Sequence, residues 1–425
     1  MLPSSTWKTS KFRKLYQLII VSVLIGFLAS FLAIAIKRIT EHFESVLFAK
    51  VVQYPVYCFL FPLIGLTVIY FLRKNLFKNK ENKGIKEIFE SIASHSKRLP
   101  IYKIPSHFIN GILTVVFGGS TGIEVSTVVA SATIGSVAQH KGGYLKRYKT
   151  AFICAGVAAG ITALFSSPIA GILFALEVIS KKFNRIFIVT TIVAVTASSG
   201  LLNLLAEPAL FALKITSWHL YAIPYFILLG VLAGIHSVFL TKSVLLIKNK
   251  FSKIENSFYK ITLASFALGL AIYFFPTLYG DGYHGITAIV AHPNTVFTVS
   301  FFIAMAGIVV LKPILTAITL ASGGDGGVFA PSLVIGGFLG LLIATLLNTY
   351  FNANVIPINF IIIGMAALLS ASIHAPFTAL FLVCGITNDY TLFVPILLTC
   401  LVSKYTAKFI YPYTVYSYSL KLAKI

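Results

Sequence analysis

The sequence predicts an α-helical protein that crosses a membrane many times. Of the 425 residues, 57% are hydrophobic and only 11% are charged, and the mean hydropathy is +0.90. A soluble domain needs a larger polar surface than this composition supplies. Only helices or closed barrels satisfy the backbone in lipid, and the long apolar runs lack the alternation typical of barrel strands. Helices are therefore expected.

Uncharged runs mark the expected membrane segments in chain order. Residues 17–36, 51–72 and 215–241 carry no charge. Each run is long enough to cross a hydrocarbon layer of about 30 Å as a helix. The first run is too long for the apolar core of a signal peptide, and further membrane segments follow it, so we expect it to be retained as the first helix.

The net charge of +22 lies mainly in the loops between apolar runs, which argues against a nucleic-acid partner. The bias of Lys and Arg toward the cytoplasmic side predicts that these loops, and both termini, face the cytoplasm. Such loops attract anionic lipid headgroups, and a basic vestibule also raises the local concentration of anions; both readings stay open. The basic clusters span 8–14, 73–103, 141–149, 181–185, 242–260 and 404–424.

Neither a metal site, a cofactor nor an enzyme is expected. The four cysteines lie in apolar stretches without metal-ligand spacing, and the nine histidines form no HExxH or HxxxH pattern. A membrane-embedded enzyme would need paired carboxylates, a Ser/His or Ser/Lys pair, or a metal cluster. The acids embedded in the motif-bearing segments are Glu124, Glu177 and Asp325, and no histidine accompanies them at a fixed offset.

An internal repeat becomes visible when the sequence is compared with itself at an offset of about 205 to 208 residues. GGSTGIEVS at 118–126 falls on GGDGGVFAP at 323–331, and 152–177 falls on 360–385. We expect one membrane domain, 1–425, built from a first repeat of about 15–212 and a second of about 215–422, with no cytoplasmic regulatory domain. Duplicated halves broken by Gly and Pro are typical of transporter folds with a site near mid-membrane.

The two Gly-rich turns are candidate anion sites. Each precedes an apolar helical run, so free backbone N–H groups at a positive helix end would face an anion. Glu124 lies in the first turn. An ionisable residue in a membrane is a functional hypothesis, and a carboxylate here could replace the anion when charged and leave when protonated. The alternative is that Glu124 only caps the helix dipole.

These residues resemble the CLC family of chloride channels and proton-coupled chloride exchangers, over about 17–422. GVFAP at 327–331 matches the family's GxFxP motif, and GIEVS at 122–126 is similar to its G(K/R)EGP motif. AGILFALEV at 170–178 and HAPFTALFLVCGITNDYTLFVPILLTCLV at 374–402 are similar to the helices that follow the two motifs. Tyr416 falls where the family has its inner-gate tyrosine.

The resemblance implies an all-α CLC-type fold of two inverted repeats of tilted, broken helices, in a homodimer with one pore per subunit. Glu124 would be the external gate. The partners implied are chloride ions, protons and membrane lipid. The residues implied in anion binding are Gly122, Ile123, Glu124, Val125, Gly327, Val328, Phe329, Ala330 and Tyr416.

The central site departs from the family pattern. The family's central serine belongs to a GSGIP motif, and the best local match is 82–86, where Lys83 replaces the serine. An ammonium there would tighten anion binding. We favour the alternative that 73–98 is a solvated loop and the match is accidental. Val125 and Ser126 replace a glycine and a proline beside the gate, which leaves the backbone less freedom.

The inner proton position also departs. Exchangers of the family usually carry a second glutamate just after the position of Glu177, and here that position is Val178, a residue found in channels. A buried proton path needs titratable groups, which valine does not offer. We interpret Glu177 as structural. Neither Gly385, where an acid is common, nor Asp325, which precedes the second turn, has a functional account from the sequence.

We therefore expect chloride conduction that is channel-like or loosely coupled, through a pore gated by Glu124, in a multi-pass integral membrane protein. The alternatives are proton-coupled chloride antiport and a fluoride-selective relative. Anion selectivity, pH dependence and voltage dependence are left open.

Overall fold

The computed structural model describes residues 4–80, 82–94, 98–138, 145–180, 183–211, 215, 217–291 and 298–422, with side chains from 13 to 418. The expected end of the first repeat, 212, lies outside these residues, as do parts of the basic clusters at 8–14, 141–149 and 181–185. Within them the chain is helical, and the one pairing of extended backbone is an isolated bridge.

Seventeen α-helices follow one another in the part of the chain that the structure describes, with short 3-10 and π segments between them. The helices are α1 (Ser4–Gln53), α2 (Tyr57–Phe71), α3 (Ile85–Ala93), α4 (Lys103–Val116), α5 (Glu124–Ala138), α6 (Lys149–Phe165), α7 (Pro168–Phe174), α8 (Arg185–Leu204), α9 (Ile223–Ser252), α10 (Ser257–Phe274), α11 (Tyr283–Ala291), α12 (Val299–Ala321), α13 (Phe329–Phe351), α14 (Pro357–Ile373), α15 (Pro376–Thr387), α16 (Phe393–Ile410) and α17 (Val415–Leu422). The π segments are η1 (Leu72–Leu76) and η4 (Ala175–Ser180).

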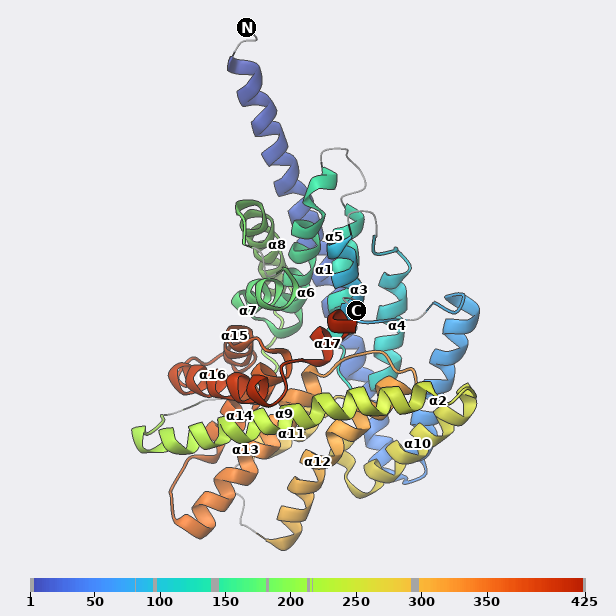
Figure 1. The fold of residues 1–425 in the computed structure, drawn as a ribbon, viewed down its shortest axis with the longest axis vertical. Helices are drawn as coiled ribbons and strands as arrows, with labels where there is room; N and C mark the ends of the chain where they lie inside the picture. The colour runs from blue at the N-terminus through green and yellow to red at the C-terminus, as the bar shows by residue number, and fades with distance from the viewer. Residues whose placement is uncertain are drawn as a thin grey trace.

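The predicted membrane class is confirmed. Eight helical spans in the described ranges are long and apolar enough to cross a membrane. The N-terminal part of α1 projects from the top of the molecule, and α9 crosses the lower half of the view (Figure 1). α17 lies near the centre and contacts α3. Shorter apolar helices, α5, α6 and α14 among them, are buried between the long ones. The protein is an integral membrane protein.

The two halves repeat the same order of elements. α4, α5, α6, α7 and α8 correspond to α12, α13, α14, α15 and α16. α6 and α14 both end on a residue with positive φ, Ser166 at 52° and His374 at 56°, and the next helix starts with Pro168 or Pro376. Because such end geometry is set locally, its recurrence at an offset of 208 agrees with duplication.

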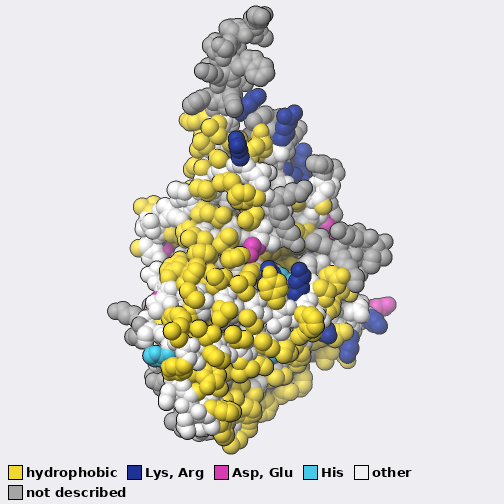
Figure 2. Space-filling view, turned by 60° about the vertical axis from the view of Figure 1, so that its left-hand side comes forward, with side chains coloured by type: hydrophobic (Ala, Val, Ile, Leu, Met, Phe, Trp, Pro, Cys, Tyr) yellow, Lys and Arg dark blue, Asp and Glu magenta, His cyan; other side chains and the backbone are white. Residues whose placement is uncertain are grey.

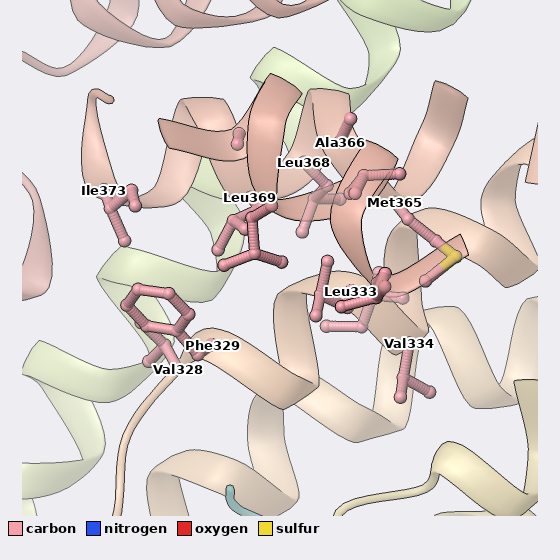
Figure 3. Close-up of a cluster of buried hydrophobic side chains, with 14 of the residues drawn as sticks. Val328, Phe329, Leu333, Val334, Met365, Ala366, Leu368, Leu369 and Ile373 are labelled. Atoms are coloured by element: carbon pink, nitrogen blue, oxygen red, sulfur yellow. The ribbon is translucent and has the colours of Figure 1, made fainter. Parts of the chain in front are cut away.

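The buried core lies around α13 and α14, which pack closely along their length. Gly336 and Gly364 face each other so tightly that a Cβ on either glycine would collide with the other's carbonyl oxygen. Figure 3 shows Phe329 below Leu369 and Ile373, where α13 begins. Small residues that let helix backbones approach are the usual means of packing in membranes, where lipid gives helices no hydrophobic drive to associate.

The outer surface is largely apolar. Figure 2 shows hydrophobic side chains over most of one face, with Lys and Arg mainly toward its upper end and one flank. Exposed side chains such as Phe31, Leu204 and Val394 would be costly in water, but they match the hydrocarbon core of a bilayer.

Two segments differ from the sequence prediction. The first helix extends well beyond 17–36, because Lys37 and Arg38 pair with Glu207 and so keep their charges satisfied within the helical bundle. The interpretation of 73–98 as a solvated loop was wrong for much of its length. η1 and α3 lie within it, and Ile85 and Ile88 of α3 are fully buried, because their side chains share one face of an amphipathic helix.

Candidate functional site

The two Gly-rich turns meet. Gly122 and Gly327 form an antiparallel bridge, and Thr121 Oγ1 donates a 2.8 Å hydrogen bond to the carbonyl of Gly327. The two glycines are equivalent under the repeat offset of 205. Because equivalent residues of the two halves pair antiparallel here, a two-fold axis that relates the halves passes close to this bridge. Inverted repeats have this arrangement.

Two threonines hold the turns together by a reciprocal exchange. Thr114 Oγ1, before the first turn, accepts from the backbone N–H of Asp325 at 2.9 Å. Thr319 Oγ1, before the second, accepts from the backbone N–H of Ser120 at 3.1 Å. Each repeat therefore satisfies a buried donor of the other, and buried N–H groups are costly when left unpaired.

Glycine is required where the turns touch. A Cβ on Gly327 would collide with Val125 Cγ2 and would lie 3.0 Å from the Tyr416 hydroxyl oxygen. A Cβ on Gly122 would collide with Glu124 Oε2. Gly326 also has φ of +147°, which side chains rarely allow. Close backbone approach is what brings the two helix starts to one point.

Helices α5 and α13 begin at this point, and their first N–H groups have no partners within their own helices. The first ladder bonds run from Thr127 N to the carbonyl of Ile123 and from Ser332 N to that of Val328. The N–H groups before them, at 124–126 and 329–330, are therefore free of the helical ladder. Two positive helix ends directed at one place form an anion site without a full positive charge.

The Glu124 side chain lies at this place. It is 1% exposed, and its carboxylate folds back over Gly122 and close to Ala330, the second residue of α13. Oε1 accepts a 2.8 Å hydrogen bond from the Tyr283 hydroxyl. The carboxylate thus lies beside the starts of α5 and α13, where an anion would otherwise be attracted.

A group of buried titratable residues surrounds Glu124, the residue expected to be the gate. We call Glu44, Glu124, Asp281, Tyr283 and Lys312 the gate cluster. Asp281 Oδ1 accepts from the Tyr283 backbone at 2.8 Å, and Glu44 Oε1 accepts from the Asp281 backbone at 3.2 Å. Lys312 is fully buried and donates to the carbonyl of Gly280 at 2.9 Å. The Lys312 ammonium attracts the three carboxylates, and an ionised Glu124 is repelled by Asp281.

Sequence reasoning missed four members of the gate cluster. Glu44, Asp281, Tyr283 and Lys312 come from α1, the turn before α11, the start of α11 and α12. One signal could have found Lys312, because it is the only charge within the apolar run of α12, and an ionisable residue inside a membrane segment indicates function.

Residues 64–408 match the voltage-gated chloride channel family. The chain belongs to this family.

Relatives and solved structures agree with that assignment. The H(+)/Cl(-) exchange transporter ClcA of Cronobacter sakazakii is 28% identical over 92% of this chain and 87% of that protein. The crystal structure of a slow cyanobacterial Cl-/H+ antiporter has the same fold, with a TM-score of 0.81 at 21% identity, over 96% of this chain and 98% of that one. A CLC-type fluoride/proton antiporter follows at a TM-score of 0.78 and 22% identity, covering 95% and 98%. The CLC-type fold expected from the motifs is confirmed.

Within this chloride channel family member, the structure gathers the residues that the resemblance implied. Gly122, Ile123, Glu124 and Val125 lie against Gly327, Val328, Phe329 and Ala330 across the bridge. α17 brings the Tyr416 hydroxyl next to Gly327, and Tyr416 is 9% exposed.

Lys83, considered as a possible central-site residue, has its side chain outside the bridge region. Its neighbour Gly84 comes close to the site, since a Cβ there would lie 3.3 Å from Val125 Cγ1. The Lys83 side chain, however, is exposed and lines a cavity of about 360 Å³ together with Glu87 and Lys103. Neither Gly-rich turn forms a wall of this cavity. The ammonium therefore lies outside the bridge region, because a hydrated Lys head favours water over a buried site.

The inner proton position holds Val178, which is 6% exposed in η4. The adjacent Glu177 is committed elsewhere: its Oε2 accepts from both the backbone N–H and the hydroxyl of Thr378, each at 2.7 Å. This contact joins the first repeat to the start of α15. Packing explains the glycine at position 385, because a Cβ there would collide with Ser167 Cβ and Oγ.

Proposed function

We propose that this protein exchanges chloride for protons across the membrane. The observation that carries the proposal is the Glu124 carboxylate lying between the starts of α5 and α13. A carboxylate and a chloride ion compete for one positive place, so an ionised Glu124 excludes the anion and a protonated Glu124 admits it. Anion movement and proton binding are thereby linked.

The known relatives support exchange over our first expectation of channel-like conduction. That expectation rested on the two Gly-broken segments and on Val178, which cannot carry a proton. ClcA of Cronobacter sakazakii is named as an H(+)/Cl(-) exchange transporter, and the cyanobacterial structure with a TM-score of 0.81 is a Cl-/H+ antiporter. An exchanger without an acid at 178 needs another route for its protons.

Proteoliposomes test the proposal directly. An outward chloride gradient imposed on sealed vesicles should drive protons inward against their own gradient. Chloride efflux without proton movement would show a channel and overturn exchange. In Glu124→Gln vesicles we expect chloride flux that no longer depends on pH and no proton movement. A residue that merely caps a helix would instead lower the amount of folded protein and leave the flux per molecule unchanged.

Fluoride is a second candidate substrate. It is favoured by the likeness to the fluoride/proton antiporter structure, with a TM-score of 0.78, and by a central segment that lacks serine and proline. Repeating the assay with chloride, nitrate and fluoride decides between them: exchange that is at least as fast with chloride as with fluoride supports our proposal.

We also propose that the protein works as a homodimer in which each subunit contains its own complete pore. We further propose that both termini face the cytoplasm and that the protein catalyses no covalent reaction. The gate cluster and both turns come from one chain, so a subunit holds a whole site. The mass of the detergent-solubilised protein, measured by light scattering with the detergent subtracted, should equal two chains of 46.2 kDa.

A further inference from the structure

Buried acids in the described part of the chain divide into two groups. They are Glu44, Glu124, Asp281 and Asp325, each no more than 6% exposed. The first three belong to the gate cluster. Asp325 makes its contacts elsewhere, among residues from α4 and the segment before α3. If the protein exchanges protons for chloride, as proposed above, a proton must reach Glu124 from the side opposite the gate, and the position of Val178 offers no carrier.

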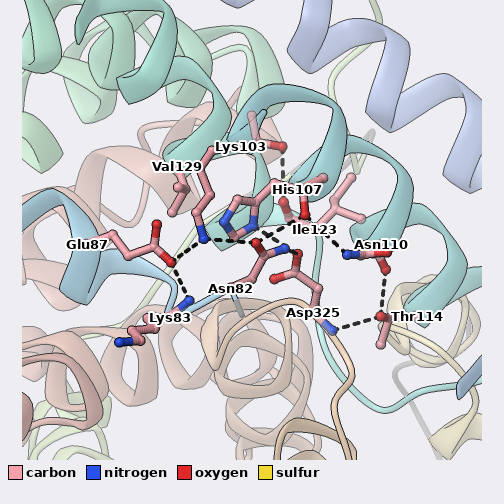
Figure 4. A network of polar contacts seen from close by, with 12 residues as sticks. Asn82, Lys83, Glu87, Lys103, His107, Asn110, Thr114, Ile123, Val129 and Asp325 are labelled. Carbon is pink, nitrogen blue, oxygen red and sulfur yellow. Dashed lines mark hydrogen bonds and ion pairs between the residues drawn. The ribbon is translucent and has the colours of Figure 1, made fainter. Parts of the chain in front are cut away.

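Asp325 is held in a compact polar network, shown in Figure 4. Its Oδ2 accepts a 2.6 Å hydrogen bond from Asn82 Nδ2 and lies 2.9 Å from His107 Nδ1. His107 is fully buried, and its second ring nitrogen, Nε2, has no hydrogen-bond partner among the described residues. The imidazole therefore keeps one ring nitrogen that no described protein group occupies.

The network extends to the cavity beside Lys83. Asn82 Oδ1 accepts from Lys103 Nζ at 3.2 Å and from Ser106 Oγ at 3.1 Å. Lys103 Nζ also pairs with Glu87 Oε1 at 2.8 Å, and both Lys103 and Glu87 line the cavity. The Asn82 amide does not carry protons itself; it orients the Asp325 carboxylate. A continuous line of polar groups thus joins Asp325 to an opening.

The relation between the two repeats indicates that this network and Glu124 lie on opposite sides of the bridge between Gly122 and Gly327. His107 in α4 and Lys312 in α12 are equivalent at an offset of 205. Because the repeats are inverted, equivalent positions lie on opposite sides of the paired Gly122 and Gly327. Lys312 lies in the gate cluster, so His107 and Asp325 lie on the other side. Asp325 is also only two residues from Gly327.

Polar groups that face Asp325 come from three segments. His107 belongs to α4, and the neutral Asn82 amide precedes α3. Arg73 of η1 also acts on the Asp325 carboxylate, and its Nη1 lies beside Gly323 at the start of the same turn. The ionised carboxylate is therefore not an isolated buried charge, because an arginine and a histidine lie near it.

We propose that Asp325 and His107 together form the proton-carrying site on the side of the pore opposite Glu124. Water in the cavity delivers a proton to the pair, where the imidazole nitrogen or the carboxylate oxygen binds it. The proton is then passed through water to the Glu124 carboxylate, which becomes neutral and leaves the anion site. Each transfer forms one O–H or N–H bond as another breaks, and no other bond changes.

The test measures chloride and proton movement in the same proteoliposomes. In Asp325→Asn we expect chloride flux to persist while protons moved per chloride fall by at least about tenfold, as expected when a proton-transfer group is lost. His107→Gln should behave alike, and Asp325→Glu should restore part of the ratio. A purely structural role would lower both fluxes in proportion. An unchanged ratio in either Asp325→Asn or His107→Gln overturns the inference.

Ser199→Ala is the control, because it removes a hydroxyl that donates to the Val195 carbonyl within α8 and lies outside the network. Its ratio should equal that of the wild type; an equal loss would mean that the ratio does not depend on the Asp325 network, against the proposal. If the wild type moves no protons, the proposed exchange fails. If the wild type moves protons and either variant keeps its ratio, exchange stands and only the joint role of Asp325 and His107 fails.

Discussion

The Tyr283 hydroxyl donates a 2.8 Å hydrogen bond to Oε1 of Glu124. This contact holds the gate carboxylate in the place between the two helix starts. The turn that carries Tyr283 is itself fixed by Lys312, which donates to the Gly280 carbonyl at 2.9 Å. The position of the gate therefore depends on a residue from the second repeat.

Removing this hydroxyl should loosen the gate. A hydrogen bond to a charged group contributes about 1.5 kcal/mol or more, so Tyr283→Phe should raise chloride flux at neutral pH by up to about tenfold. Flux is measured by chloride release from vesicles. Tyr279→Phe is the control: this buried hydroxyl donates to the Val116 carbonyl at 2.6 Å and does not bond to Glu124. Equal effects in both variants would contradict a role in gating.

A methyl group at the bridge should block the site. Gly327→Ala places a Cβ against Val125 and the Tyr416 hydroxyl, and overpacking of this kind costs about 1–3 kcal/mol. We expect chloride flux per folded molecule to fall strongly. Gly200→Ala in α8, where a Cβ meets nothing within 4 Å, should leave flux unchanged and raise stability by up to about 1 kcal/mol. Normal flux in Gly327→Ala would remove the bridge from the anion path.

The reciprocal threonines should contribute similar stability. Thr114→Val and Thr319→Val each leave a buried N–H without its acceptor, which costs about 1–3 kcal/mol. Thermal unfolding in detergent should show lowered midpoints for both. In the control Thr262→Val, an exposed hydroxyl that bonds only within its own helix is lost, and the midpoint should move little. A drop in only one of the two would argue against the symmetry of the turns.

The orientation of the chain can be checked with one introduced cysteine. All four natural cysteines are buried, so Asn249→Cys at the exposed end of α9 gives a single reactive site. A membrane-impermeant maleimide should label it in inside-out vesicles and not in sealed right-side-out vesicles. The reverse pattern would place the basic loops outside, against the bias of Lys and Arg.

The helix breaks and the buried position of Glu124 at the first of them could be predicted because their signals are local. Gly118 to Gly122 and Gly323 to Gly327 stand out against apolar surroundings, and Glu124 is an acid in a membrane segment. The duplication then indicated that the two turns belong together. Composition and the long uncharged runs were sufficient for the helical membrane class, because lipid leaves the backbone few alternatives.

The contacts that assemble the gate cluster could not be predicted. The Asp281 backbone and the Glu44 carboxylate are 237 residues apart in the sequence, and Tyr283 and Glu124 are 159 apart. The motif match left the position of Lys83 undecided, and the fold places its side chain in an open cavity.

The sequence by itself determined a helical membrane protein with two Gly-broken segments and an acid in the first of them. These properties follow from hydropathy, backbone freedom and the dipole at a helix start, which depend on neighbours in the chain. Only the tertiary structure decided that the Tyr283 hydroxyl bonds to Glu124 and that Asp325 faces His107. Such contacts depend on how two inverted halves pack, and packing joins residues that carry no local mark of each other.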